Sequence, residues 1–211
     1  MLSKFRTKSL FLVILIASSF TVMACGGSKS APDEQPVETA IDETEEAVEE
    51  VEDEVVEEMS RRVARAKMIS GSGESLGEVT FTQTDDGVQI TGDIAGLGEA
   101  GSRGFHVHEF GKCDGPDFMS AGGHFNPAGH QHGAPENAPE ARHAGDFGNI
   151  EINDDDGANL DLKDHVITLK AGENNIVGHA LIIHAQQDDL TSQPTGDAGA
   201  RAACGIIELV E

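Results

Sequence analysis

The chain of 211 residues contains no tryptophan and no tyrosine, and its nine phenylalanines are its only large aromatic residues. A core must therefore be built mainly from valine, isoleucine, leucine and alanine. Basic residues are also scarce, because 14 Lys and Arg stand against 38 Asp and Glu, and the formal net charge is −24. A protein that binds nucleic acid needs a basic face, so this charge balance excludes nucleic acid as a partner.

The three cysteines amount to one pair and one odd residue. Residues 1–24 explain the odd one, because three basic residues precede an apolar stretch that ends at Val22 and is too short for a comfortable membrane span. The segment closes on Ala24-Cys25 and resembles a bacterial lipoprotein signal, in which the cysteine is lipidated and becomes the first residue of the mature protein. The alternative is an ordinary signal peptide cut near Ala24. Either signal exports the chain, so a disulfide becomes permissible.

Residues 25–66 have a different composition. Between Asp33 and Glu58 there are 14 acidic residues and no basic one, which predicts a mostly disordered tether that holds the folded part away from a membrane. A helix is the alternative, because Val48, Val51, Val55 and Met59 recur at three to four residues. The expected location is a bacterial membrane, at the outer membrane and periplasm or at the cell surface. A cluster of basic residues then reverses the charge, and we place the start of the folded domain at Lys67, so that it spans 67–211.

The folded part is predicted to be all-β. Glycine is abundant, with 25 residues, which suits a protein rich in turns. Alternating apolar and polar residues, bounded by turn signals, predict strands at residues 78–83, 88–91, 104–110, 148–152, 165–169, 178–185 and 205–210. Short strands of this kind are typical of a sandwich or barrel. Two long segments, 111–145 and 186–201, interrupt the strands, and loops of that length in a compact domain are usually functional.

Nine histidines are the most informative feature of the composition. His106 and His108 stand two apart in a predicted strand, so their rings point to the same face, and His184 ends another strand. The first long loop and its end carry His124, His130, His132, His143 and Asp146. Imidazole with carboxylate suits Zn(II), and an imidazole-rich set suits Cu(II). We assign no role in metal binding to His130, His165 and His179.

Four motifs resemble those of the copper/zinc superoxide dismutase family. They are Gly104-Phe-His-Val-His-Glu-Phe-Gly111, Gly123-His-Phe-Asn-Pro127, Arg142-His-Ala-Gly-Asp-Phe-Gly-Asn149 and Gly199-Ala-Arg-Ala-Ala-Cys-Gly205. The resemblance runs from about Lys67 to the C-terminus, with the motifs in family order. It implies an eight-stranded Greek-key β-barrel or sandwich with two long functional loops, of the bacterial, exported lipoprotein type.

The resemblance also implies which residues act. Copper would be held by His106, His108, His124 and His184. Zinc would be held by His124, His132, His143 and Asp146, with His124 bridging the two ions and His130 as the local rival of His132. Asp188 would link a copper histidine to a zinc histidine. Cys113 and Cys204 would form the internal disulfide, and Arg201 would dock the anionic substrate beside copper.

The implied reaction is the conversion of superoxide to dioxygen and hydrogen peroxide by alternating Cu(II) and Cu(I). Zn(II) would support His124, which would release copper on reduction and carry a proton. The competing hypothesis is an exported lipoprotein that buffers copper and zinc without turnover. The oligomeric state, a homodimer included, stays open at this point.

Overall fold

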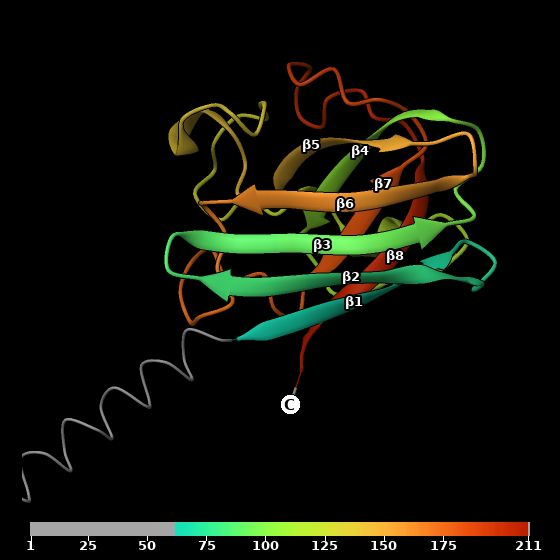
Figure 1. Ribbon diagram of the computed structural model, residues 1–211. Helices are drawn as coiled ribbons and strands as arrows, with labels where there is room; N and C mark the ends of the chain where they lie inside the picture. Colours follow the sequence, from blue (N-terminus) through green and yellow to red (C-terminus); the bar gives the residue numbers. More distant parts are fainter. Residues whose placement is uncertain (1–61, 211) are drawn as a thin grey trace, which may run out of the picture. The chain divides into compact units, whose positions relative to one another are not determined.

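The computed structural model describes residues 62–210 (Figure 1). They form eight strands: β1 (Val63–Ser70), β2 (Ser75–Thr84), β3 (Gly87–Ala95), β4 (Gly101–His108), β5 (Asp146–Ile152), β6 (Gly157–Asp164), β7 (Ala180–His184) and β8 (Arg201–Leu209). Two short 3-10 helices, η1 (Met119–Ala121) and η2 (Pro139–Ala141), lie in the first long loop. Within residues 62–210 no helix is long and apolar enough to cross a membrane. The expected signal peptide, Cys25 and the acidic tether up to residue 61 lie outside the described residues.

The eight strands form one antiparallel sheet that curls into a nearly closed barrel. Their order is β5-β4-β7-β8-β1-β2-β3-β6, so the edge strands are β5 and β6, which also follow one another along the chain (Figure 1). The turn between Asn153 and Gly157 joins these edges at one end. At the other end Arg142 donates to the Asp146 carbonyl at 2.9 Å and pairs with Asp164. The predicted Greek-key barrel of eight strands is thus confirmed.

The barrel begins earlier than Lys67. In β1 the side chains of Ala64, Ala66 and Met68 are fully buried, whereas Arg65 and Lys67 are exposed. Arg65 and Lys67, which belong to the basic cluster before the predicted domain start, are therefore solvent-facing positions of a strand. The neighbouring buried positions Ala64 and Ala66 carry little hydrophobic signal.

The strand predicted at 165–169 is wrong, and the sixth strand is β6, just before it. In β6 the small or apolar residues Ala158 and Leu160 alternate with polar ones. After the strand, the carboxylate of Asp164 accepts hydrogen bonds from the N–H groups of Val166 at 2.7 Å and Ile167 at 2.9 Å. These bonds turn the chain out of the ladder, because the amides that a strand would pair with a neighbour are already satisfied locally.

The first long loop is fastened to the outside of the barrel. A disulfide joins Cys113 in the first loop to Cys204 in β8, with the Cα atoms 5.7 Å apart, as the sequence resemblance implies. Phe118, which is fully buried, packs with Cys204 and Ile182 on the outer face of β7 and β8. Residues 111–145 therefore cover part of the barrel surface instead of extending into solvent.

Candidate metal centre

The outer face of β4 carries two histidines. Alternation along the strand sends Phe105 and Val107 into the core and His106 and His108 to the opposite face. These imidazoles are nevertheless buried, with exposed fractions of 0% and 1%. The two long loops cover this face, since His106 bonds to Asp188 in one loop and His108 to the Gly122 carbonyl in the other.

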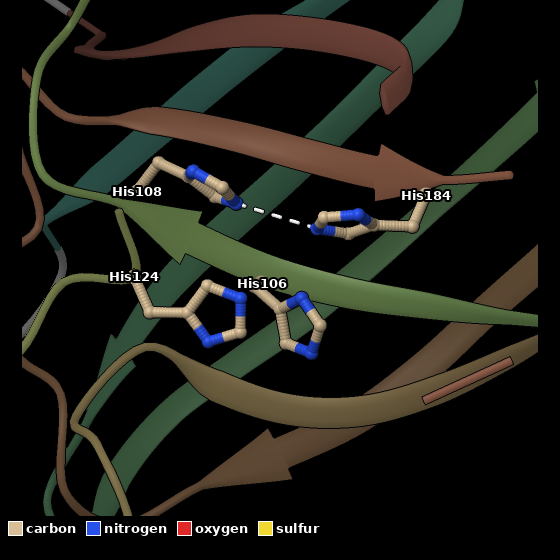
Figure 2. Close-up of side chains that lie close together, drawn as sticks. All are labelled: His106, His108, His124 and His184. Carbon is tan, nitrogen blue, oxygen red and sulfur yellow. Dashed lines mark hydrogen bonds between the residues drawn. The ribbon is translucent and has the colours of Figure 1, made fainter. Parts of the chain in front are cut away.

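His124 and His184 join these two histidines to form a cluster of four (Figure 2). His184 is the last residue of β7, and His124 lies opposite His108 in an isolated β-bridge. Each of the four residues offers one ring nitrogen, and these nitrogens all lie within 4.8 Å of one another. The arrangement can therefore hold one metal ion by imidazole nitrogens alone.

Hydrogen bonds to backbone carbonyls decide where two of these rings carry their proton. Nδ1 of His108 donates to the Gly122 carbonyl at 3.0 Å, and Nδ1 of His184 donates to the Gly199 carbonyl at 3.2 Å. A carbonyl oxygen can only accept, so in the neutral rings the Nε2 atoms are unprotonated. These two Nε2 atoms face each other at 3.4 Å (the dashed line in Figure 2), an arrangement of two lone pairs that a shared cation would satisfy.

The other two members of the cluster leave buried nitrogens without partners. Nε2 of His106 donates to Asp188 Oδ2 at 2.7 Å, which leaves its Nδ1 as a lone pair. Within residues 62–210, neither this Nδ1 nor Nε2 of His124 has a hydrogen-bond partner. Buried polar atoms of this kind are rare unless a ligand or water satisfies them.

His124 also belongs to a second cluster, with His132, His143 and Asp146. Asp146 Oδ1 lies 2.8 Å from Nδ1 of His124 and 3.1 Å from Nδ1 of His143. Asp146 Oδ2 lies 3.1 Å from Nδ1 of His132, although the two are not aligned for a hydrogen bond. Three imidazole nitrogens around one carboxylate are a typical donor set for tetrahedral Zn(II). His124 thus offers Nδ1 to this cluster and Nε2 to the other.

Asp188 connects the two clusters from outside. Its Oδ2 accepts from His106 and its Oδ1 accepts from Nε2 of His132 at 3.0 Å. Its backbone is held by Asn149, whose Oδ1 accepts from the Asp188 N–H at 2.8 Å and whose Nδ2 donates to the Asp188 carbonyl at 2.9 Å. Gly196 packs directly against this carboxylate, where a Cβ atom would collide with both Asp188 and His132. Asp188 therefore holds the outer nitrogen of each ring, so that the inner nitrogens of His106 and His132 are aimed at the clusters.

The carboxylates dominate the second cluster electrostatically. Burial would raise the pKa of Asp146, but hydrogen bonds from His124 and His143 and the nearby imidazole of His132 hold that pKa far below its usual value. Burial alone would lower the pKa of His132, because it disfavours the charged imidazolium. The carboxylates of Asp146 and Asp188 outweigh this effect and raise the pKa of His132 to about 9. Without a metal, His132 is therefore protonated between two carboxylates, and a bound cation would replace that proton.

In the first cluster, burial has the larger effect and lowers the pKa values of the histidines. Burial lowers the pKa of His106 to about 3 despite its bond to Asp188, and burial lowers the pKa of His184 to about 4. Burial also lowers the pKa values of His108 and His124. These rings stay neutral at physiological pH, which is the protonation state that metal ligation requires.

Arg201, at the start of β8, lies beside the first cluster. Its guanidinium donates through one terminal nitrogen to the Phe118 carbonyl and through the other to the Gly122 carbonyl. The Gly122 carbonyl also accepts from His108, so one oxygen atom ties the arginine to the histidine cluster. Arg201 is only partly buried, so its positive charge remains accessible to a small anion.

The structure brings together the expected metal ligands, Asp188 and Arg201, whereas Cys25 lies outside the described residues. The two clusters contain the expected histidines and Asp146, and Asp188 and Arg201 contact them. His130 lies apart, with its Nδ1 2.9 Å from the Pro139 carbonyl. The sequence analysis missed Asn149 and Gln193, amide residues that hold the backbones of Asp188 and His132. Asn149 ends one of the four quoted motifs, whereas no local pattern marks Gln193.

Comparison with known proteins decides the family. The family described as copper/zinc superoxide dismutase (SODC) matches residues 75–207. The chain belongs to the copper/zinc superoxide dismutase family. Two relatives from Aquifex aeolicus (strain VF5), superoxide dismutase (Cu-Zn) 1 and 2, are 41% and 42% identical to it over 147 and 148 residues. The matched regions cover 68% of this chain and 86% and 85% of the relatives.

Solved structures agree with this assignment. A double mutant of a SOD-like protein from Bacillus subtilis is 38% identical, with a TM-score of 0.63, over 67% of this chain and 94% of that one. The clock protein EA4 is 37% identical, with a TM-score of 0.64, over 72% of this chain and 96% of that one.

The family implies copper and zinc as cofactors, and the residues of this chain fit both. The unpartnered nitrogens of His106 and His124 and the facing Nε2 atoms of His108 and His184 suit an imidazole-bound copper ion. The cluster around Asp146 suits zinc.

Proposed function

We propose that this chain is a superoxide dismutase that converts two superoxide anions and two protons to dioxygen and hydrogen peroxide. The observation that carries the proposal is His124, whose two ring nitrogens serve two adjacent donor sets, one of imidazoles and one with a carboxylate. Bound copper would supply the Cu(II)/Cu(I) couple, and bound zinc would support His124. The chain supplies the geometry, a group that transfers protons from solvent, and the binding of the anion.

The copper ligands in this proposal are His106, His108, His124 and His184, and the zinc ligands are His124, His132, His143 and Asp146. The outer nitrogens of His106, His108, His132 and His184 are fixed by carbonyls or by Asp188, so that the inner nitrogen of each of these rings faces its ion. His124 has no such carbonyl or outer carboxylate, and its Nδ1 faces Asp146. Its Nε2 is therefore the atom best placed to hold and release a proton during the reaction.

Arg201 is the proposed docking residue for superoxide. Two backbone carbonyls hold its guanidinium in one orientation. Its remaining N–H groups and its charge can orient a small anion beside the copper ligands. The neighbouring loop reads Gln186-Gln187-Asp188-Asp189 and contains no lysine. Attraction of the anion should therefore depend mainly on Arg201 and the bound ions.

Metal analysis combined with a superoxide assay tests this function. The purified chain, loaded with copper and zinc, should contain one of each ion and should consume superoxide generated by xanthine oxidase. A chain that binds both ions and consumes no superoxide would instead support a metal buffer.

We further propose that Cys25 anchors the enzyme by a lipid to a bacterial membrane after export. The support is the sequence of residues 1–25 and the acidic stretch that separates Cys25 from β1. A chain with Cys25→Ser should be released in soluble, active form, whereas wild-type chain should fractionate with membranes. Equal membrane association of both chains would contradict the anchor.

A further inference from the structure

Gln193 holds the backbone of His132 with both ends of its side-chain amide. Its Oε1 accepts from the His132 N–H at 2.8 Å, and its Nε2 donates to the His132 carbonyl at 2.9 Å. Of the side chains, only asparagine and glutamine carry such a neutral acceptor and donor side by side. The two residues are 61 positions apart, so this pair of bonds fastens the loop 186–201 to the loop 111–145.

The same loop also holds the ring of His132. Asp188 accepts from Nε2 of His132, five residues before Gln193 in the same loop. His132 is thus fixed at its backbone by one residue of the loop and at its imidazole by another. Its remaining nitrogen, Nδ1, lies 3.1 Å from Asp146 Oδ2.

Gln193 is itself held by the local structure of its loop. Its Nε2 also donates to the Thr191 carbonyl at 3.2 Å. The Asp189 carboxylate accepts from the N–H groups of Thr191 at 2.9 Å and Ser192 at 2.8 Å, which forms a fixed turn just before Gln193. The amide is therefore placed by the turn and is not a freely moving side chain, although it lies at the protein surface.

We infer that Gln193 is a positioning residue for the zinc half of the site, acting through the backbone of His132. This inference rests on the proposed function for the identity of the ion. Without the two amide bonds the His132 backbone loses its attachment to the loop 186–201 and keeps only the neighbouring bond from the Gly133 N–H to Asp146 Oδ2, at 3.1 Å. Zinc binding must then meet the cost of ordering this backbone. His106, His108 and His184 have no bond to Gln193, so the copper half should be affected less.

Two substitutions separate positioning from mere loop stability. Gln193→Glu keeps the length and the acceptor but places a carboxylate against the carbonyl oxygens of His132 and Thr191. Gln193→Met removes both bonds without adding charge. Gln187→Glu is the matched control, because Gln187 is exposed in the same loop and makes the same change of charge. Both positions are exposed and lie outside the core, so the barrel should fold in every variant.

The experiment measures the zinc dissociation constant of each full-length chain by competition with a chromophoric chelator. It also records the visible spectrum of Co(II) bound at the zinc site, which reports ligand geometry. We expect zinc affinity to fall about tenfold or more in both Gln193 variants, the loss typical of groups that orient a metal ligand. The Co(II) spectrum should change in both, and Gln187→Glu should match the wild type.

Unchanged zinc affinity and an unchanged Co(II) spectrum in both Gln193 variants would overturn the inference. So would a loss of zinc affinity confined to Gln193→Glu and Gln187→Glu, because the added charge alone would then explain it. A wild-type chain that binds zinc normally but consumes no superoxide would overturn the proposed function and leave the role of Gln193 standing.

Discussion

Reduction of the disulfide should remove a large part of the stability of the metal-free protein. Cys113 and Cys204 are 91 residues apart, so the bond restricts most of the unfolded barrel. The loop-entropy relation gives a loss of about 4.6 kcal/mol at 25 °C for a loop of this length. A domain of this size has a free energy of unfolding of about 5–15 kcal/mol, so the reduced form should be only marginally stable.

The native fold should change little on reduction, because the first loop has other attachments. Phe118 is buried against Ile182 and Cys204, and its carbonyl accepts from Arg201. The disulfide therefore acts mainly on the unfolded chain. We expect the far-ultraviolet circular dichroism of the folded protein to stay the same while the midpoint of unfolding falls.

Urea unfolding of the metal-free chain tests this expectation with and without a phosphine reductant. The chain carries Cys25→Ser, so that Cys113 and Cys204 are its only cysteines. Metals are removed because ions that bind only the native state would add their own stabilisation. The same chain with both cysteines replaced by alanine is the control, and the reductant should not affect it. A difference between oxidised and reduced protein below about 1 kcal/mol would refute the loop-entropy argument.

Three further predictions concern the site. His132→Ala should abolish high-affinity zinc binding and His130→Ala should leave it intact, as metal analysis after dialysis would show; the reverse pattern would reassign the ligand. The value of kcat/KM for superoxide should fall as ionic strength rises. Arg201→Ala should lower this value about tenfold and flatten its salt dependence, since the charge-assisted hydrogen bond from the guanidinium to superoxide is lost. From Met59 onward there are 24 acidic and 10 basic residues, so a rate that increases with salt would mean that this acidic surface dominates. Finally, burial lowers the pKa values of His106 and His184 to about 3 and 4, so the unfolded chain binds protons that the folded chain cannot. These two rings therefore contribute stability to the metal-free protein that is fully present above about pH 6.5 and is lost as the pH falls toward 4. Urea unfolding across that range should show the decrease.

The sequence predicts the fold best where alternation is strong. In β4, Phe105 and Val107 alternate with two histidines, which yields both the strand and the side of the sheet on which the site lies. The pattern is weaker in β1, where Ala64 and Ala66 occupy buried positions, and the strand begins at Val63 instead of near Lys67. Residues 165–169 contain enough β-branched residues to suggest a strand, but the Asp164 carboxylate captures the following amides.

The sequence likewise predicts one part of the candidate site, its metal ligands, and misses another, the groups that hold those ligands. The spacing of His106 and His108 reveals two members of one donor set, and the resemblance of the motifs supplies the rest. Neither reveals how the rings are held. Asn149 and Gln193 act on backbone groups 39 and 61 residues away, and such contacts leave no local pattern in a single sequence. The tautomers also depend on the carbonyls of Gly122 and Gly199, whose positions only the folded loops establish.

Titration of the zinc-loaded chain with copper tests the central claim most directly. Superoxide decay is followed by stopped-flow absorbance while copper is added in steps to a known concentration of protein. The account predicts that the decay rate rises in proportion to copper and reaches a plateau at one copper per chain, because one cluster of His106, His108, His124 and His184 does the chemistry. A rate that does not rise with bound copper would contradict the account, as would one that keeps rising beyond one equivalent.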